Sequence, residues 1–322
     1  MPAISCARFY SCLLVLVSIG SSGTLEAQET ATRMVIGLDV VCRAAPNHSA
    51  TVVHSYVLGD FVLATRESRE VEGYWYFDQG WVTGQSPTCW VYGPLTTEFV
   101  NSNPEPALVA VTDHVLQRKD QGRFEDYIAV DNLLTYDYSS VLASSGLLQF
   151  RRLSIIERAV SLPMVKRYLV VKDPLMRAWL LSHQDLLKFF EPDGAWFLQP
   201  ETYWALYEKH KQEPWAEELA WAAAQVWVPS DECYANCALQ KVHRTFQQYW
   251  TRFPNGIWIH TAIEKAASMA KYGARVACED LPVPRPFFDE MRASLAGVTD
   301  PGKQELLGSL NELEQAQGKC RR

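Results

Sequence analysis

The hydrophobic pattern of this 322-residue chain changes its period once, near residue 98. Between residues 34 and 98, short β-branched and aromatic runs alternate with Gly, Pro and Asp, a pattern typical of closely spaced strands. Further along the chain, apolar residues recur at three- and four-residue spacing, as they do on one face of a helix. The sequence therefore predicts a multidomain α+β protein, with a small β-barrel or sandwich followed by an all-α helical domain.

The first 27 residues have the three parts of a secretory signal peptide. Arg8 lies in a positive amino-terminal stretch, and residues 9–19 form an apolar run that is too short to cross a bilayer, which takes about 20 residues. Small and polar residues follow, so cleavage is expected after Ala27 or, alternatively, after Gly23. An uncleaved membrane anchor is the other interpretation. Export predicts a periplasmic or secreted protein without a transmembrane segment once the signal is removed.

The β-rich part is expected to contain six short strands, and the charged run at residues 66–72 is interpreted as an exposed turn. The expected strands are residues 34–41, 52–57, 61–65, 74–77, 81–83 and 89–92.

The order of short motifs in this part is similar to that of bacterial SH3 domains over about 65 residues. The matching motifs are Val40-Val41-Cys42-Arg43-Ala44-Ala45-Pro46, Leu58-Gly59-Asp60, Trp75-Tyr76 and Cys89-Trp90-Val91. The resemblance implies an SH3-like barrel in which the first and last strands lie side by side, with an insertion at residues 80–88. Cys42 and Cys89 both depart from the family's motifs and would face each other there, which implies a Cys42–Cys89 disulfide.

The helical part resembles the C-terminal region of exported bacterial proteins that carry an SH3 domain and whose role is unknown. The matching residues are Ala220-Trp221-Ala222-Ala223-Ala224-Gln225, Glu232-Cys233, Tyr249 and Phe253-Pro254-Asn255-Gly256. The expected division is a signal peptide (1–27), an SH3-like barrel (34–98), a linker and first helix (99–125), a helical domain (126–229), and a disulfide-linked helical hairpin with C-terminal helices (230–322). One helix is expected over residues 175–190, and a short extended piece at 195–198.

Six cysteines remain after removal of the signal, an even number that favours disulfides in an exported chain. They are Cys42, Cys89, Cys233, Cys237, Cys278 and Cys320. Cys278 ends the returning helix of the hairpin at the level of Cys233, so Cys233–Cys278 is the preferred second pair, and Cys237–Cys320 follows by elimination. A zinc site with His243 is the alternative, but the spacing fits no common zinc finger, and no metal or other cofactor is expected.

No catalytic residue is assigned from the sequence, because metal-binding, nucleophile-elbow and phosphate-loop motifs are all missing from it. Cys233 near a helix start would suit a cysteine amidohydrolase, but the surrounding motif of that class is absent. His183 and Asp185 lie near Glu191 and Asp193, and these acids are interpreted as capping or surface groups. The net charge of −7, without a basic stripe, argues against nucleic acid as a partner.

Aromatic side chains in the β-rich part are the remaining candidates for binding, since SH3-like barrels hold extended peptides in aromatic grooves. The tentative ligand-binding set is Tyr56, Tyr74, Tyr76, Trp81 and Tyr92. Trp75 and Trp90 are expected to be buried, and Trp81, in the inserted hairpin, to be the most exposed to a ligand.

The sequence thus favours an exported, non-enzymatic binding or scaffold protein whose barrel contacts a cell-wall peptide or a protein segment. Its partner would be the peptide of peptidoglycan or an envelope protein. The alternative is a cell-envelope hydrolase with an unrecognised active site, and a third possibility is a barrel that only packs on the helices.

Overall fold

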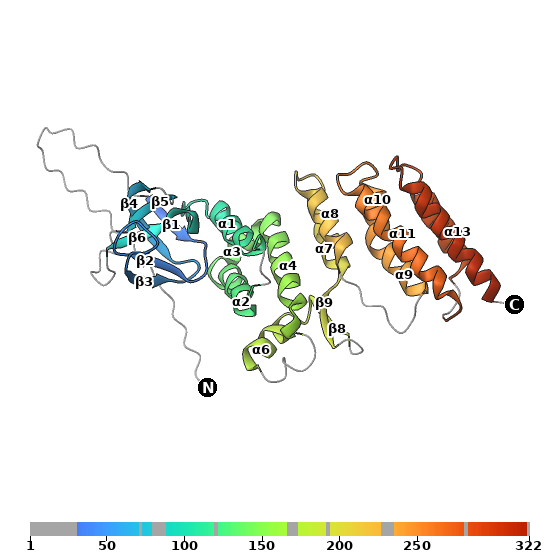
Figure 1. The fold of residues 1–322 in the computed structure, drawn as a ribbon, viewed down its shortest axis with the longest axis horizontal. Helices are drawn as coiled ribbons and strands as arrows, with labels where there is room; N and C mark the ends of the chain where they lie inside the picture. The colour runs from blue at the N-terminus through green and yellow to red at the C-terminus, as the bar shows by residue number, and fades with distance from the viewer. Residues whose placement is uncertain are drawn as a thin grey trace, which may run out of the picture.

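A β-rich region at the N-terminal end is followed by a mostly helical region, and the helices succeed one another along the long axis of the molecule (Figure 1). The computed structural model describes residues 31–70, 73–78, 88–118, 122–165, 173–190, 194–226, 235–279 and 283–320. Within these ranges, no helix is both long enough and apolar enough to cross a membrane.

The β-rich region is a seven-stranded antiparallel sheet with the strand order β3-β2-β6-β5-β4-β1-β7. Its strands are β1 (Ala31–Val35), β2 (Val40–Arg43), β3 (Val52–Tyr56), β4 (Phe61–Glu70), β5 (Gly73–Asp78), β6 (Cys89–Tyr92) and β7 (Thr96–Glu98). The expected side-by-side placement of the opening and closing segments is present, because β2 pairs with β6.

The sheet is open, whereas a closed barrel was expected. In the part of the chain that the structure describes, the outer strands β3 and β7 are not paired with each other. Strand β7 instead leads into the helices, and Phe99 packs between Phe61 of the sheet and Tyr138 of the helical region, with ring centroids 4.7 and 6.3 Å apart. Helices therefore lie beside β7, at the edge where a closed barrel would place another strand.

Two strand boundaries differ from those expected. The segment 34–41 is split into β1 and β2 by a tight turn, in which Asp39 adopts a left-handed φ of 55° and the backbone of Gly37 lies close to Val40. The charged run at 66–72 was expected to be an exposed turn, but its residues as far as Glu70 belong to strand β4, which pairs with the aromatic strand β5. The expected strand at 81–83 lies outside the described residues.

The sheet encloses a small apolar core stapled by a disulfide. Cys42 and Cys89 are bonded, with Cα atoms 5.5 Å apart, and this is the pair that the SH3 resemblance implies. Cys42 is also paired in register with Val91, so the bond joins the adjacent strands β2 and β6. The buried members of this core are Val35, Val40, Cys42, Tyr56, Val62, Cys89 and Val91.

The helical region begins directly after the sheet. Its α-helices are α1 (Glu105–Leu116), α2 (Phe124–Asn132), α3 (Ser139–Ser144), α4 (Gly146–Ser161), α6 (Pro174–Ser182), α7 (Pro200–His210), α8 (Ala216–Gln225), α9 (Ala235–Val242), α10 (Gln248–Arg252), α11 (Ile259–Arg275), α12 (Arg285–Ser294) and α13 (Lys303–Cys320). Leu133–Asp137 and His243–Gln247 are π-helical turns that continue α2 and join α9 to α10.

The region was expected to be all-α, but a β-hairpin interrupts it. Helix α6 ends at Ser182, and the segment expected to extend it to residue 190 forms β8 (Leu187–Phe190), paired with β9 (Ala195–Leu198). The cause is local, since the aromatic rings of Phe189 and Trp196 pack across the two strands with centroids 5.1 Å apart. The extended piece expected at 195–198 is confirmed as β9.

Contacts between helices run mainly between neighbours in the row. Helix α4 packs on α1, α2 and α7; α7 packs on α8; and α11 lies between α9 and α13. Met34 and Ile36 of the N-terminal region join the same buried apolar cluster as the helices. The sheet is thus attached through a shared core.

The C-terminal helices confirm the expected hairpin, in which α10 ends before Pro254 and α11 returns, but correct its disulfides. Cys278 is bonded to Cys320, with Cα atoms 5.2 Å apart, so the expected pairs Cys233–Cys278 and Cys237–Cys320 are wrong. Helix α13 packs along α11, and this places Cys320, the last residue of α13, beside Cys278, which follows the end of α11. Cys233 and the side chain of Cys237 lie outside the described residues. Two disulfides are consistent with an oxidising compartment outside the cytoplasm.

Candidate ligand-binding sites

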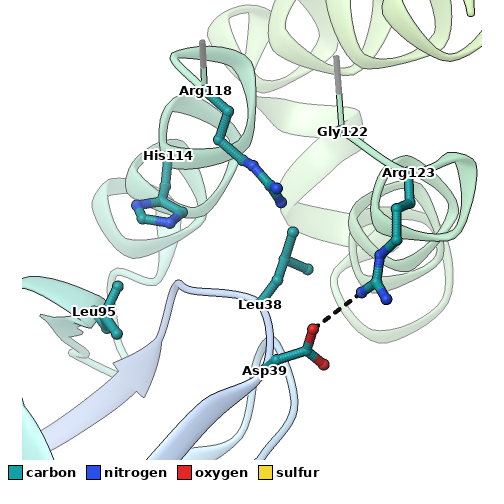
Figure 2. A pocket seen from close by; sticks show the side chains of 7 residues that line it. All are labelled: Leu38, Asp39, Leu95, His114, Arg118, Gly122 and Arg123. Carbon is teal, nitrogen blue, oxygen red and sulfur yellow. Dashed lines mark hydrogen bonds and ion pairs between the residues drawn. The ribbon is translucent and has the colours of Figure 1, made fainter. Parts of the chain in front are cut away.

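A pocket of about 470 Å³ opens where the β1–β2 turn meets the helices. Figure 2 shows its lining, with side chains from the turn on one wall and from the end of α1 and the start of α2 on the other. The lining residues are Leu38, Asp39, Leu95, His114, Arg118, Gly122 and Arg123. Two of these seven, Arg118 and Arg123, carry positively charged side chains, so the pocket is cationic at its helical wall.

A buried carboxylate holds the two arginines in place. Asp126 in the first turn of α2 is 2% exposed, and its Oδ2 accepts a hydrogen bond of 3.1 Å from Nη1 of Arg118. Its Oδ1 accepts a second bond of 3.1 Å from Nη2 of Arg123. The backbone N–H of Arg123 also donates to Asp126, at 3.0 Å. Both guanidinium groups are therefore oriented before any ligand arrives.

The opposite wall offers one weak partner. Asp39 accepts a 3.1 Å contact from Nη2 of Arg123, but the two side chains are 82% and 61% exposed, and such surface pairs contribute little. Burial and the nearby charge of Arg118 lower the pKa of His114 below its usual value, so this imidazole is neutral at neutral pH. A ligand carboxylate can replace Asp39 on Arg123 at small cost.

The described members of the aromatic set expected from the sequence do not gather into one patch. Tyr56 is 6% exposed and belongs to the small core of the sheet, so it is not a surface residue. Tyr76 is half-buried beneath the guanidinium of Arg33, which lies 4.0 Å from its ring centroid. Tyr92 is half-buried against His48, with ring centroids 4.9 Å apart. The side chains of Tyr74 and Trp81 lie outside the described residues.

Strand register explains why the set is divided. Tyr76 is paired with Val91, which is fully buried, whereas Tyr92 is the next residue along β6 and points to the other face. Trp90, expected to be buried, is half-buried instead, because Cys89 and Val91 occupy the inward positions on either side of it. The side chain of Trp75 lies outside the described residues.

The cationic pocket was not predicted from the sequence. His114 and Arg118 are four residues apart, one helical turn, and this spacing was the available signal. Their approach to Asp39 depends on how the sheet docks on α1 and α2, which spacing does not reveal.

A second polar cluster lies deeper, around Asp131 of α2, which is 1% exposed. Its Oδ1 accepts a 2.7 Å bond from Nε of Arg152, and its Oδ2 accepts bonds of 3.0 Å from Nε1 of Trp179 and from Nε2 of His183. Burial alone would raise the pKa of Asp131, but the hydrogen bond from His183 and the charge of Arg152 outweigh it and lower that pKa. This carboxylate is therefore ionised and fully engaged.

The cluster has the order of a catalytic triad but not its chemistry. Oγ of Ser182 lies 3.0 Å from Nδ1 of His183, whose Nε2 faces Asp131. However, Nδ1 also lies 2.8 Å from the carbonyl oxygen of Trp179, and a carbonyl only accepts, so Nδ1 is protonated and donates there. The hydroxyl of Ser182 donates to that same carbonyl, at 2.7 Å. The serine thus has no basic nitrogen to activate it.

Of the residues that the sequence places near His183, the structure describes Asp185 but not Glu191 or Asp193. His183 is 5% exposed inside the Asp131 network, whereas Asp185 is exposed. Glu191 and Asp193 lie outside the described residues. Over the described ranges, no three His, Cys, Asp or Glu side chains are close enough to hold a metal ion.

A second pocket, of about 300 Å³, lies beside this network between α4 and α7. It is lined by Leu142, Gln149, Arg152, Leu153, Leu186, Thr202, Ala205, Leu206 and Lys209. Arg152 therefore belongs both to the buried network and to a surface cavity. Comparison with known proteins finds no matching protein family, no similar curated protein and no similar solved structure.

Proposed function

We propose that this chain is an exported, non-enzymatic binding protein that holds a carboxylate-bearing peptide segment at the junction of its N-terminal sheet and its helices. The segment would come from the peptide of peptidoglycan or from an envelope protein. The observation that carries the proposal is the pair Arg118 and Arg123, anchored by buried Asp126 at the wall of a 470 Å³ pocket.

The chemistry of the pocket favours an anionic, peptide-like ligand. A guanidinium group donates two parallel hydrogen bonds to a carboxylate, and two such groups held in fixed directions select for it. Leu38 and Leu95 add apolar surface beside them, as is usual in small-ligand sites. Neutral His114 adds a hydrogen-bonding group without a further charge.

The proposal also includes the assignment of the N-terminal sheet as SH3-like. The pairing of β2 with β6, the Cys42–Cys89 bond and the order of the sequence motifs support an SH3-like sheet as the docking part of the protein. The signal-like N-terminus and the disulfides support a periplasmic or secreted location. The row of helices then serves as a scaffold that carries the sheet at one end (Figure 1).

The test is calorimetric titration of the mature protein with the stem pentapeptide L-Ala-D-Glu-L-Lys-D-Ala-D-Ala. Its fully amidated form is the matched control ligand. We expect the free acid to bind, and Arg123→Gln to weaken it about tenfold, the typical effect of losing a hydrogen bond to a charged group. Arg177→Gln removes an exposed arginine elsewhere, on α6, and should leave affinity unchanged.

Three outcomes would overturn the proposal. They are equal binding of the amidated peptide, an unchanged affinity for Arg123→Gln, and release of soluble fragments when purified peptidoglycan is incubated with the protein. The last would identify a hydrolase.

Trp81, the aromatic anchor expected from the sequence, gives a further check. Trp81→Ala should weaken binding by about 2 kcal/mol if it contacts the peptide.

A further inference from the structure

The pocket between α4 and α7 is lined by both aliphatic and polar side chains. Four leucines supply the apolar part: Leu142, Leu153, Leu186 and Leu206. The polar part consists of Gln149, Arg152, Thr202 and Lys209. Residues 202, 205, 206 and 209 share one face of α7, so this helix presents both kinds of group to the cavity.

Several of these polar groups remain available to a ligand. The amide of Gln149 is used, because its Nε2 donates to the carbonyls of Leu142 and Ala143 at 3.2 and 3.1 Å. By contrast, the hydroxyl of Thr202 and the ammonium of Lys209 contact no hydrogen-bonding or ionic side chain among the described residues. They are free to bind an oxygen atom.

Arg152 is fixed from behind. Its Nε donates to Asp131 at 2.7 Å and its Nη2 lies 3.1 Å from Nε2 of His183, while its Nη1 has no hydrogen-bond partner in the described part of the chain. The carboxylate of Asp131 is buried and does not line the cavity. The guanidinium of Arg152, a residue that lines the pocket, is thus held in one orientation, which lowers the entropy cost of binding an anion.

Among the described residues that line the pocket, Arg152 and Lys209 are the only charged side chains, so this part of the lining carries two cations and no acid. Its volume of about 300 Å³ corresponds to about ten water molecules, room for one branched aliphatic chain with a head group. We infer that this pocket binds a small aliphatic carboxylate, its tail among the leucines and its carboxylate on Arg152 and Lys209. This chemistry belongs both to a free short-chain acid and to a leucine-like peptide C-terminus.

The first experiment titrates the mature protein with 4-methylpentanoate and with 4-methylpentanamide, which has the same tail without the charge. We expect saturable binding of the acid and affinity for the amide lower by about tenfold or more, as for other hydrogen bonds to charged groups. Equal binding of the two, or no saturable binding of the acid, would overturn the inference.

Two variants locate the site without disturbing the buried network. Ala205 is an exposed residue of the lining, so Ala205→Trp should fill the cavity and abolish binding while the thermal midpoint stays unchanged. Ala293→Trp, at an exposed position on α12, is its control. Lys209→Gln should weaken binding about threefold, as for an exposed ion pair, and Lys188→Gln should not. Binding that survives Ala205→Trp would contradict the assignment.

A second titration separates the two sources of the carboxylate. The peptide acetyl-Ala-Gly-Ala-Leu is compared with the same peptide ending in leucinamide. If the acid peptide binds at least as well as 4-methylpentanoate and Ala205→Trp blocks it, the ligand is a peptide C-terminus. If N-terminal extension abolishes binding, the ligand is a small free acid. Neither result depends on Arg123, whose variant tests the pocket at the β1–β2 turn. This inference and the proposed function can therefore fail separately.

Discussion

Asp131 on α2 and His183 at the end of α6 lie 3.0 Å apart, Oδ2 to Nε2, inside the helical region. Both side chains are buried, and Arg152 on α4 contacts both of them. Three helices that are separate in sequence are therefore joined by one polar network. The network also holds the guanidinium of Arg152 at the edge of the α4–α7 pocket.

Removing the charge of Asp131 should destabilise this region. Asp131→Asn leaves Arg152 without its carboxylate, and breaking a buried pair in this way typically costs about 3 kcal/mol. Urea unfolding followed by near-ultraviolet circular dichroism measures the change. Asp185→Asn, at an exposed position two residues beyond His183, is the control and should have no effect. An unchanged free energy of unfolding for Asp131→Asn would show that the network does not stabilise the fold.

The difference in free energy of unfolding between the wild type and Asp131→Asn should depend on pH. The pKa of Asp131 is lowered in the folded protein from its ordinary value of 3.8, so its stabilising effect is complete above that value and is lost as the pH falls through the folded pKa. The gap between the wild type and Asp131→Asn should therefore narrow in strong acid. A gap that is constant with pH would contradict an ionised Asp131.

Glu157 should show the opposite dependence. Burial raises its pKa above the ordinary 4.5, although the hydroxyl of Tyr203 donates a 2.7 Å bond to it. The folded state thus favours the protonated acid, and stability is lost as the pH rises from that ordinary value through the folded pKa. Glu157→Gln cannot ionise, so it should be more stable than the wild type at neutral pH and nearly equal to it in acid. Glu264→Gln, at an exposed position on α11, should show no such trend.

Tyr249 should hold the loop between α10 and α11. Its hydroxyl donates to Oε1 of Glu217 at 2.7 Å and accepts from the N–H of Trp258 at 3.1 Å, while the N–H of Ile257 donates to the same carboxylate oxygen at 2.6 Å. Tyr249→Phe should cost about 1.5 kcal/mol. It should also speed hydrogen exchange at the Trp258 amide, whereas protected amides in α13 should be unaffected. Unchanged exchange at Trp258 would rule out this role.

The two disulfides should stabilise different parts of the molecule. Each closes a loop of more than 40 residues, with separations of 47 and 42, and such loops are worth about 4 kcal/mol in the chain-entropy model. Replacing Cys42 and Cys89 by alanine should destabilise the sheet, and replacing Cys278 and Cys320 should loosen α13. Hydrogen exchange resolved by segment separates the two effects, and non-reducing peptide mapping checks the pairs. Recovery of Cys278 linked to Cys233 would contradict the structure.

Export predicts a shortened N-terminus. Mass spectrometry of the native protein should find a mature start between Thr24 and Gln28, because the apolar run at residues 9–19 is followed by small residues. Intact Met1 in the cytoplasmic fraction would contradict this. The uncleaved anchor would instead appear as intact Met1 in the membrane fraction.

Features that depend on near neighbours were predictable from the sequence. The change from strands to helices, the hairpin that turns at residues 253–256 and the short strand at 195–198 all follow from local spacing and turn residues. Periodicity failed at residues 187–190, where the same apolar residues fit a helix or a strand and cross-strand packing of Phe189 on Trp196 selects the strand.

The sequence by itself determined most of the strands and helices, because hydrophobic period and turn residues act over a few positions; residues 66–70 and 187–190 are the exceptions. Only the tertiary structure decided what those segments face. Asp131 meets Arg152 and Trp179 across 21 and 48 residues, and Cys320 reaches Cys278 because α13 packs along α11. The two cationic pockets arise in the same way, since Arg118 and Arg152 acquire their roles from the elements docked beside them. Such pairings depend on the relative free energies of whole packed arrangements, which no local pattern records.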